Sequence, residues 1–104
     1  SSMAIKNFKH KGLKKLFLHG DHSGVQPKHA VKLTIILDAI AASHQPRDLR
    51  ALFQAKFAEK VGSGTGVYSI EVNGNWRVTF ELEDDGAVLL DYRDYHGKQI
   101  RAQK

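Results

Sequence analysis

The sequence contains no cysteine among its 104 residues. This absence excludes a disulfide framework, a thiolate metal site and a thiol nucleophile, and it agrees with a reducing compartment. Long apolar runs are absent too. The longest apolar-rich stretch, residues 33–42, is interrupted by Thr34 and Asp38 and is half as long as the roughly 20 residues of a membrane-spanning helix. It lies in the middle of the chain, so it is not read as a signal peptide. We therefore expect a cytoplasmic protein with no membrane partner.

Length and composition predict one folded domain. A chain of 104 residues buries roughly two thirds of the surface that its unfolded form exposes. With 41% hydrophobic residues it is too apolar to be disordered. Ser1 and Ser2 precede the only methionine and are interpreted as residues left by cloning. We expect the domain to cover residues 3–104, with residues 97–104 as a mobile tail.

Positive charge is concentrated in the first part of the chain. Residues 1–60 contain 11 basic and four acidic side chains, whereas residues 61–104 contain five basic and seven acidic ones. Such a cluster attracts polyanions and favours contact with nucleic acid. An acidic protein partner or a merely solvated helix face would have the same composition. The cluster begins with Lys6, Lys9, Lys11, Lys14 and Lys15.

The first half of the chain is typical of a strand followed by helices. Residues 4–8 form a short segment flanked by lysines and are predicted as a strand. Leu13, Leu16 and Phe17 follow at helical spacing, and Gly20 stands where that helix would end.

Two further helices are predicted before the glycine-rich segment 62–66. Pro27 suits the first turn of a helix that runs to about residue 42. Pro46 begins a shorter helix that runs to about residue 52, and residues 54–60 show no clear pattern. The residues expected to face the core are Leu33, Ile36, Leu37 and Ile40 in the longer helix and Leu49, Leu52 and Phe53 in the shorter one.

Alternating apolar residues in the second half predict an antiparallel meander. Asn73-Gly74 separates two alternating runs and indicates a hairpin. A two-residue loop would pair Ile70 with Arg77 and mix apolar and charged side chains on one face. We therefore predict a three-residue loop, which keeps one face apolar. It pairs Val72 with Trp76, Ile70 with Val78, Tyr68 with Phe80 and Glu71 with Arg77.

A further turn at residues 84–86 leads into a last strand, and the helices are expected to cover the apolar face of the sheet. The apolar face is predicted to carry Tyr68, Ile70, Val72, Trp76, Val78, Phe80, Leu82, Val88, Leu90 and Tyr92. The polar face is predicted to carry Glu71, Arg77, Thr79, Glu81, Asp91, Arg93 and Tyr95.

The polar face combines two arginines with carboxylates, and its last strand ends at Asp94-Tyr95-His96. Guanidinium groups suit phosphates, and a histidine with a tyrosine and a carboxylate can transfer protons. A solvated face of cross-strand ion pairs, each worth under about 1 kcal/mol, would show the same pattern. The pattern alone therefore leaves open a nucleic-acid surface and a merely structural one.

The remaining histidines are interpreted as loop residues. His19, His22 and His29 have no histidine or acidic partner at convincing ligand spacing. We therefore expect no metal ion and no cofactor.

Four segments resemble one protein family, in order along the chain. They are residues 8–17, residues 24–30, the hairpin at residues 68–80 and the Asp94-Tyr95-His96 motif. Together they are similar to the HigB toxins, which are the host-killing halves of bacterial toxin–antitoxin pairs within the RelE superfamily. The resemblance covers nearly all of residues 5–96.

The resemblance implies an α+β fold in which an N-terminal strand and two to three helices pack on an antiparallel sheet, in the order β-α-α-β-β-β. It implies a ribonuclease that enters the ribosomal A site and cuts mRNA there. It also implies a neutralising antitoxin of the HigA type with a helix-turn-helix domain. Attack of an RNA 2′-oxygen on the adjacent phosphate needs a base, an acid and positive charge at the phosphate.

The resemblance also assigns roles to individual positions. Asp94, Tyr95 and His96 match the catalytic end of the family, and Arg77 matches a phosphate-binding arginine. With the charge pattern added, the predicted catalytic residues are His96, Tyr95, Asp94 and Arg77. The predicted RNA-binding residues are Arg93, Lys60, Lys9, Lys11, Lys14 and Lys15.

One position departs from the family. HigB toxins usually carry Leu-His-Pro-Leu-Lys-Gly before the hairpin, and Ala58 stands where the histidine of that stretch is expected. A one-residue shift places Lys60 at the lysine position, but no such shift restores the histidine. Two hypotheses follow: a ribosome-dependent mRNA endoribonuclease that works from His96, or a module that binds its antitoxin or RNA and has lost catalysis.

Overall fold

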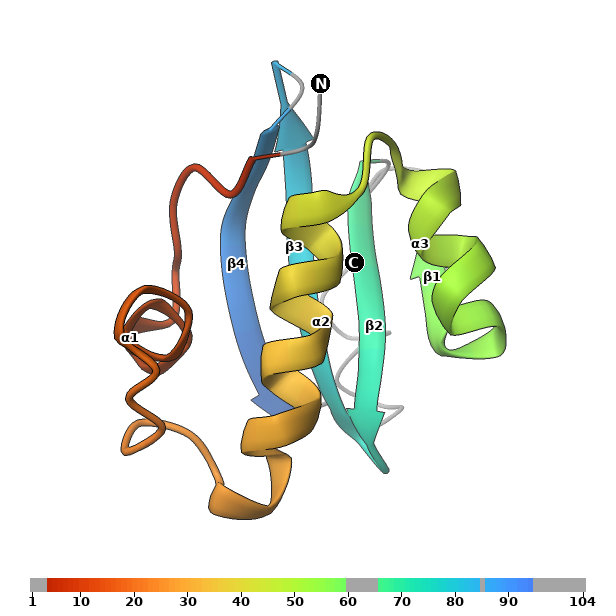
Figure 1. Cartoon of the computed structure of the whole chain (residues 1–104). Helices are drawn as coiled ribbons and strands as arrows, with labels where there is room; N and C mark the ends of the chain where they lie inside the picture. The colour runs from red at the N-terminus through yellow and green to blue at the C-terminus, as the bar shows by residue number, and fades with distance from the viewer. Residues whose placement is uncertain (1–3, 60–65, 85, 95–104) are drawn as a thin grey trace.

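The computed structural model describes residues 4–59, 66–84 and 86–94. Three helices lie on one face of a four-stranded antiparallel sheet, so the predicted α+β class is confirmed (Figure 1). The predictions for Lys60, Tyr95, His96 and the tail lie outside the described residues.

Helix α1 (Lys11–His19) forms where the sequence repeats apolar residues every three to four positions. Leu13 and Leu16 are buried against the rest of the core. The ring of His10 caps the helix, because its Nδ1 accepts a hydrogen bond from the Leu13 N–H at 3.2 Å. Gly20 ends the helix as predicted, at a φ of 69°.

Helix α2 (Ala30–Ala42) follows a 3-10 turn at Pro27–His29, and all four of its predicted core residues are buried. Helix α3 (Pro46–Phe53) buries Leu49 completely, but Leu52 is 62% exposed. The prediction that Leu52 faces the core is therefore wrong. Since α3 lies at the outer edge of the helical layer beside the first strand, only one narrow side of this helix meets the sheet (Figure 1).

The sheet has the order β1-β2-β3-β4, and each strand is antiparallel to its neighbour. The short strand β1 was not predicted, because three residues are too few to show an alternating pattern. Its Phe57 stacks on Tyr68 of β2, with ring centroids 5.9 Å apart. The strands are β1 (Phe57–Glu59), β2 (Val67–Asn73), β3 (Trp76–Glu83) and β4 (Gly86–Asp94).

Residues 4–8 lie beside β4 but form no continuous strand, so the predicted N-terminal strand is wrong. Between two isolated bridges, the Leu89 N–H donates to the side-chain oxygen of Asn7 at 2.7 Å. The Asn7 side chain thus takes the place of a backbone carbonyl. This interrupts the ladder of backbone hydrogen bonds that a continuous strand would form with β4. The bridges are parallel and join Ile5 to Ala87 and Phe8 to Leu90.

The hairpin of β2 and β3 confirms most of the predicted register. The exception is next to the turn, where an irregularity places Asn73 rather than Val72 opposite Trp76. The loop is therefore one residue shorter than predicted, and Gly74 takes a φ of 58° that glycine adopts without strain. The confirmed pairs are Tyr68 with Phe80, Ile70 with Val78 and Glu71 with Arg77.

Strand β4 contains an irregularity that moves one predicted residue to the other face. Leu89 has a φ of 57°, and the register against β3 shifts at this point. As a result Val88 lies opposite Glu81 on the polar face, while Ala87 lies opposite Leu82 under the helices. The prediction that Val88 belongs to the apolar face is wrong, because an extra residue in a strand reverses the alternation of its side chains.

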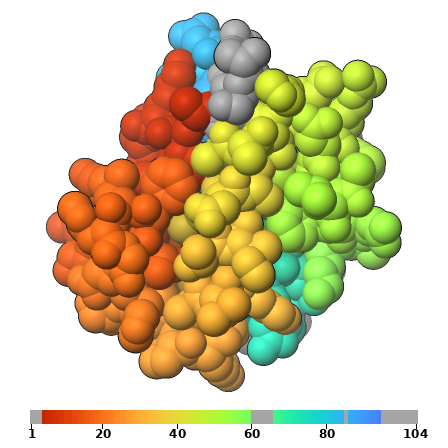
Figure 2. Space-filling view, in the orientation of Figure 1, coloured from red at the N-terminus to blue at the C-terminus, as the bar shows by residue number. Residues whose placement is uncertain are grey.

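The three helices cover most of the apolar face (Figure 2). Trp76 and Leu82 are half-buried at the margins of the core. None of the described helices is long and apolar enough to span a membrane. The predicted apolar-face residues that are buried on this side are Tyr68, Ile70, Val72, Val78, Phe80, Leu90 and Tyr92.

Replacing Leu89 by glycine is expected to stabilise the protein by about 1 kcal/mol. Glycine adopts a φ of 57° without strain, and the leucine side chain that is lost is 45% exposed. Leu52→Gly is the matched control: Leu52 is also exposed, but it lies in α3, where glycine costs about 1 kcal/mol. Urea unfolding measures both effects. Equal destabilisation by the two substitutions would contradict the left-handed conformation at Leu89.

Candidate functional site

Arg77 occupies the middle of the polar face. The strand register places Glu71 on one side of it and Arg93 on the other, as the predicted alternation requires. The Nε of Arg77 is buried, and it has no hydrogen-bond partner among the described residues. A buried donor without a partner costs free energy. The Arg77 side chain can therefore gain stability by binding an acceptor from outside the described chain.

Arg93 adds a second positive charge at the same level of the sheet. Its Nε lies 4.0 Å from the Oδ2 of Asp91, a nearly buried carboxylate whose Oδ1 accepts a hydrogen bond from the Tyr92 N–H at 2.9 Å. Like charges directly opposite each other on neighbouring strands destabilise a sheet. The pairing of Arg77 with Arg93 therefore favours an anion bound between or above the two guanidinium groups.

Asp94 ends β4 and lies opposite Trp76. In this register the side chains of Asp94 and its chain neighbour Arg93 lie on opposite faces of the sheet. The next two predicted catalytic residues, Tyr95 and His96, lie beyond the described part of the chain.

The predicted lysines lie apart from the two arginines. The Lys9 N–H donates to the carbonyl of Leu90 at 2.8 Å, which places this residue beside the outer edge of β4. Lys11, Lys14 and Lys15 are exposed on α1, on the helical side of the molecule (Figure 1). The structure thus does not join these lysines to Arg77 and Arg93 on one face.

Ala58 is exposed in β1 and lies opposite Ser69, which in turn lies opposite Thr79. Neighbours across a sheet share a face, so Ala58 belongs to the face that carries Arg77. The position at which the resemblance to HigB toxins predicts a histidine is therefore on the polar face, but here a methyl group occupies it.

His29 is buried, which corrects its interpretation as a loop histidine. Its exposed fraction is 1%, and its Nδ1 lies 2.6 Å from the hydroxyl of Tyr92. The rings of Trp76 and Tyr92 are 4.7 Å apart, and His29 packs edge-on against both. The sequence did contain a signal for this burial, since His29 lies four residues before Leu33 and so continues the apolar stripe of α2.

Burial keeps both members of this pair neutral. It lowers the pKa of His29, and Lys28 and Lys32 lower it further. Burial also raises the pKa of the Tyr92 hydroxyl, and a backbone hydrogen bond from Gln26 lowers this pKa by a smaller amount. With Gln26 donating to the phenol oxygen, the phenol donates to His29 Nδ1. The His29 proton then lies on Nε2, which has no hydrogen-bond partner among the described residues.

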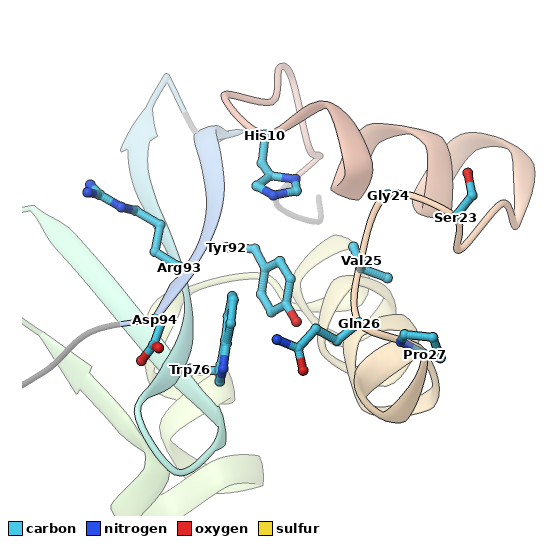
Figure 3. A pocket seen from close by; sticks show the side chains of 10 residues that line it. All are labelled: His10, Ser23, Gly24, Val25, Gln26, Pro27, Trp76, Tyr92, Arg93 and Asp94. Atoms are coloured by element: carbon cyan, nitrogen blue, oxygen red, sulfur yellow. The ribbon is translucent and has the colours of Figure 1, made fainter.

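An open pocket of about 520 Å³ adjoins this pair. Figure 3 shows that the 23–27 segment forms one wall and the ends of β3 and β4 form the other. The 23–27 wall lies directly against α1, because Gly12 has no side chain. A Cβ at this position would collide with the backbone carbonyl of Gly24. Nothing in the sequence pattern predicted this pocket. Its other lining residues are His10, Ser23, Val25, Gln26, Pro27, Trp76, Tyr92, Arg93 and Asp94. In the described part of the chain no cluster of three histidine or acidic residues could hold a metal ion.

The buried His29 is expected to make stability depend on pH. Because its pKa is lower in the folded protein than the ordinary value of 6.5, the unfolded chain takes up the proton first as the pH falls. The stability present above about pH 6.5 is therefore lost progressively below it. Urea unfolding between about pH 7.5 and pH 5 should show that wild type loses more stability than the His29→Gln variant over this range. His22→Gln, at an exposed histidine, is the matched control. The same pH dependence in wild type and His29→Gln would contradict a buried, neutral His29.

Comparison with known proteins agrees with the motifs in the sequence. The family model of the RelE-like toxin of type II toxin-antitoxin system HigB matches residues 6–96. Over 92 residues, the chain is 39% identical to the endoribonuclease HigB of Proteus vulgaris, and this match spans 88% of the chain and 99% of that protein. The chain therefore belongs to the HigB-like toxins, which are RelE-like toxins of type II toxin–antitoxin systems.

Proposed function

We propose that this protein is a cytoplasmic endoribonuclease that cuts mRNA in the ribosomal A site and that a helix-turn-helix antitoxin of the HigA type neutralises it. Membership of the HigB-like toxins and the name of the relative, an endoribonuclease, support the activity. The observation that carries the proposal is the pairing of Arg77 with Arg93 on an open sheet face, next to the strand end that leads into the predicted catalytic motif.

In this proposal the two arginines bind the phosphate at the cut. Attack of the 2′-oxygen on the adjacent phosphorus adds negative charge to the phosphate oxygens, and a guanidinium group stabilises that charge through paired N–H donors. The Nε of Arg77, which has no hydrogen-bond partner in the described part of the chain, is one such donor. Binding a phosphate would also offset the repulsion between Arg77 and Arg93.

The proton transfers are assigned to the end of β4. A base must take the proton of the 2′-hydroxyl, and an acid must protonate the 5′-oxygen that leaves. We assign these roles to His96 and Tyr95, with Asp94 orienting or charge-stabilising His96. Ala58 lies on the polar face, but its methyl group cannot transfer protons. In this proposal His96 therefore acts without the second histidine that the family resemblance predicts at this position.

The basic residues outside the sheet face are assigned to the surrounding RNA. Lys9 lies at the outer edge of β4, and the three predicted lysines of α1 are exposed on the helical side. Such positive charges attract the phosphates of RNA over a distance set by the salt concentration. We assign Lys60 to contact with the mRNA, because it precedes the hairpin in the sequence.

Ala58 favours a second function, a module that binds its antitoxin or RNA without cutting. Such a module would keep the fold and the positive charge but would lack one of the groups that transfer protons.

Substitution of Arg77 tests the nuclease. In a coupled translation reaction, primer extension should map wild-type cuts within coding sequence, and these cuts should require ribosomes. Arg77→Ala should reduce cutting by roughly 100-fold or more, and Arg77→Lys by less, since lysine keeps the charge but loses the fork of donors. Arg47→Ala, at an exposed arginine in α3, is the matched control and should cut as wild type does.

The companion variant His96→Ala tests the assignment of proton transfer and should abolish cutting while the circular dichroism spectrum stays unchanged. Unchanged cutting by both the Arg77 and His96 variants would overturn the site. If folded wild-type protein makes no cuts at any concentration, the non-cutting module becomes the correct function.

A further inference from the structure

Most of the residues that line the pocket beside His29 and Tyr92 have no part in the chemistry proposed above; Arg93 and Asp94 are the exceptions. It lies on the helical side of the strand ends, whereas Arg77 lies on the opposite side of the sheet. Two of its lining residues, Arg93 and Asp94, are nevertheless the last described residues before the predicted catalytic Tyr95 and His96. Since Arg93 lines the pocket and also lies beside Arg77, an RNA strand whose phosphate binds the two arginines would pass the mouth of this pocket.

We propose that the pocket binds one unstacked base of the RNA strand, next to the phosphate at the cut. This inference rests on the proposed function, because it takes the substrate of the enzyme as its ligand. Proteins recognise single-stranded RNA by stacking splayed-out bases on aromatic rings and by hydrogen bonds to the base edges. The pocket offers both kinds of group.

The aromatic surface comes from Trp76 and Tyr92. Their rings pack at 4.7 Å, and Tyr92 is fixed by its hydrogen bond to His29 at 2.6 Å. Since Tyr92 is buried and Trp76 only half-buried, part of the indole is reachable from the pocket. His10 stands over the edge of Tyr92, with ring centroids 5.4 Å apart. These contacts make a rigid apolar wall, which lowers the entropy cost of stacking.

The hydrogen-bonding group is the side chain of Gln26. In Figure 3 it extends from the 23–27 segment towards Tyr92 and Trp76. Gln26 is half-buried and lines the pocket, so its amide offers both a donor and an acceptor there. A primary amide can bond simultaneously to a neighbouring donor and acceptor on a base edge. The volume of about 520 Å³ falls in the range of small-ligand pockets, which is roomy enough for one base with its ribose.

The charges around the pocket also suit a nucleotide. Asp94 stands at its rim, Arg93 lines it with its side chain directed away from Trp76 and Tyr92 (Figure 3), and the chain carries a net charge of +5. A small cation would need several carboxylates, but Asp94 is the only carboxylate among the lining residues. Aromatic rings with one amide and positive charge nearby match an RNA base with its phosphate better than they match a metal ion.

The single tryptophan of the chain makes the test direct, because Trp76 gives the one indole N–H signal in a proton–nitrogen NMR spectrum. The probe is an RNA trinucleotide with 2′-O-methyl groups, which cannot be cut by attack of the 2′-oxygen. Its addition to the full chain should move the Trp76 indole and Gln26 amide signals along saturable curves. A trinucleotide that lacks its middle base should bind roughly fivefold to 100-fold more weakly, because the stacking contact is lost.

Two variants separate the pocket from the rest of the molecule. Gln26→Ala should weaken binding of the complete trinucleotide roughly threefold to tenfold. Gln54→Gly is the matched control, because it removes an exposed glutamine at the other edge of the sheet, at a φ of 52° that glycine accepts. This control should leave the affinity unchanged.

The outcomes distinguish failure of the pocket from failure of the nuclease. If both trinucleotides bind equally, the contact is to phosphate alone and the base pocket is overturned. It is also overturned if the Trp76 signal does not move while the folded protein cuts mRNA in translation reactions. If the Trp76 signal moves as expected but wild type makes no cuts, the pocket stands and the nuclease fails.

Discussion

The buried hydrogen bond between His29 and Tyr92 fixes how the helical layer sits on the end of the sheet. Most of the buried side chains are apolar, and polar groups removed from water need partners. At 2.6 Å this bond ties the turn that begins α2 to β4, although the two residues are 63 positions apart. Trp76 packs against both rings, so the ends of β3 and β4 and the start of α2 form one unit. Loss of the bond would leave the buried ring of His29 without a hydrogen-bond partner among the described residues and the hydroxyl proton of Tyr92 without this acceptor.

This unit gives the end of β4 two different sides. Arg93 lies on the open face opposite Arg77, whereas Tyr92 and Asp94 lie on the helical side. The alternation of a strand is enough to produce this division. In the function that we propose, the arginines on one side bind the phosphate at the cut, and the aromatic wall on the other side orients the rest of the RNA strand. The predicted catalytic motif includes Asp94 and continues with Tyr95 and His96, which lie outside the described residues.

The features that could be predicted depend on residues close in sequence. Leu13 and Leu16 repeat at helical spacing, and the alternation around the hairpin was enough to place Arg77 and Arg93 on one polar face. The features that were missed depend on distant contacts. Strand β1 exists only through its pairing with β2. The irregularity at Leu89 moves the side chain of Val88 from the apolar face to the polar face. The pocket is built from four separate segments, so no local pattern reveals it. The end of the site, from Tyr95 onwards, stays a prediction from the resemblance to HigB toxins.

The most direct test of this account is a double-mutant cycle on the bond that joins the two layers. Urea unfolding of wild type, His29→Gln, Tyr92→Phe and the double variant gives the coupling free energy between the two side chains. The account predicts a coupling of about 1 kcal/mol or more, with the double variant less destabilised than the sum of the single ones. A coupling near zero would contradict it, because His29 and Tyr92 would then contribute to stability independently and the helical layer would be held on the sheet by apolar packing alone.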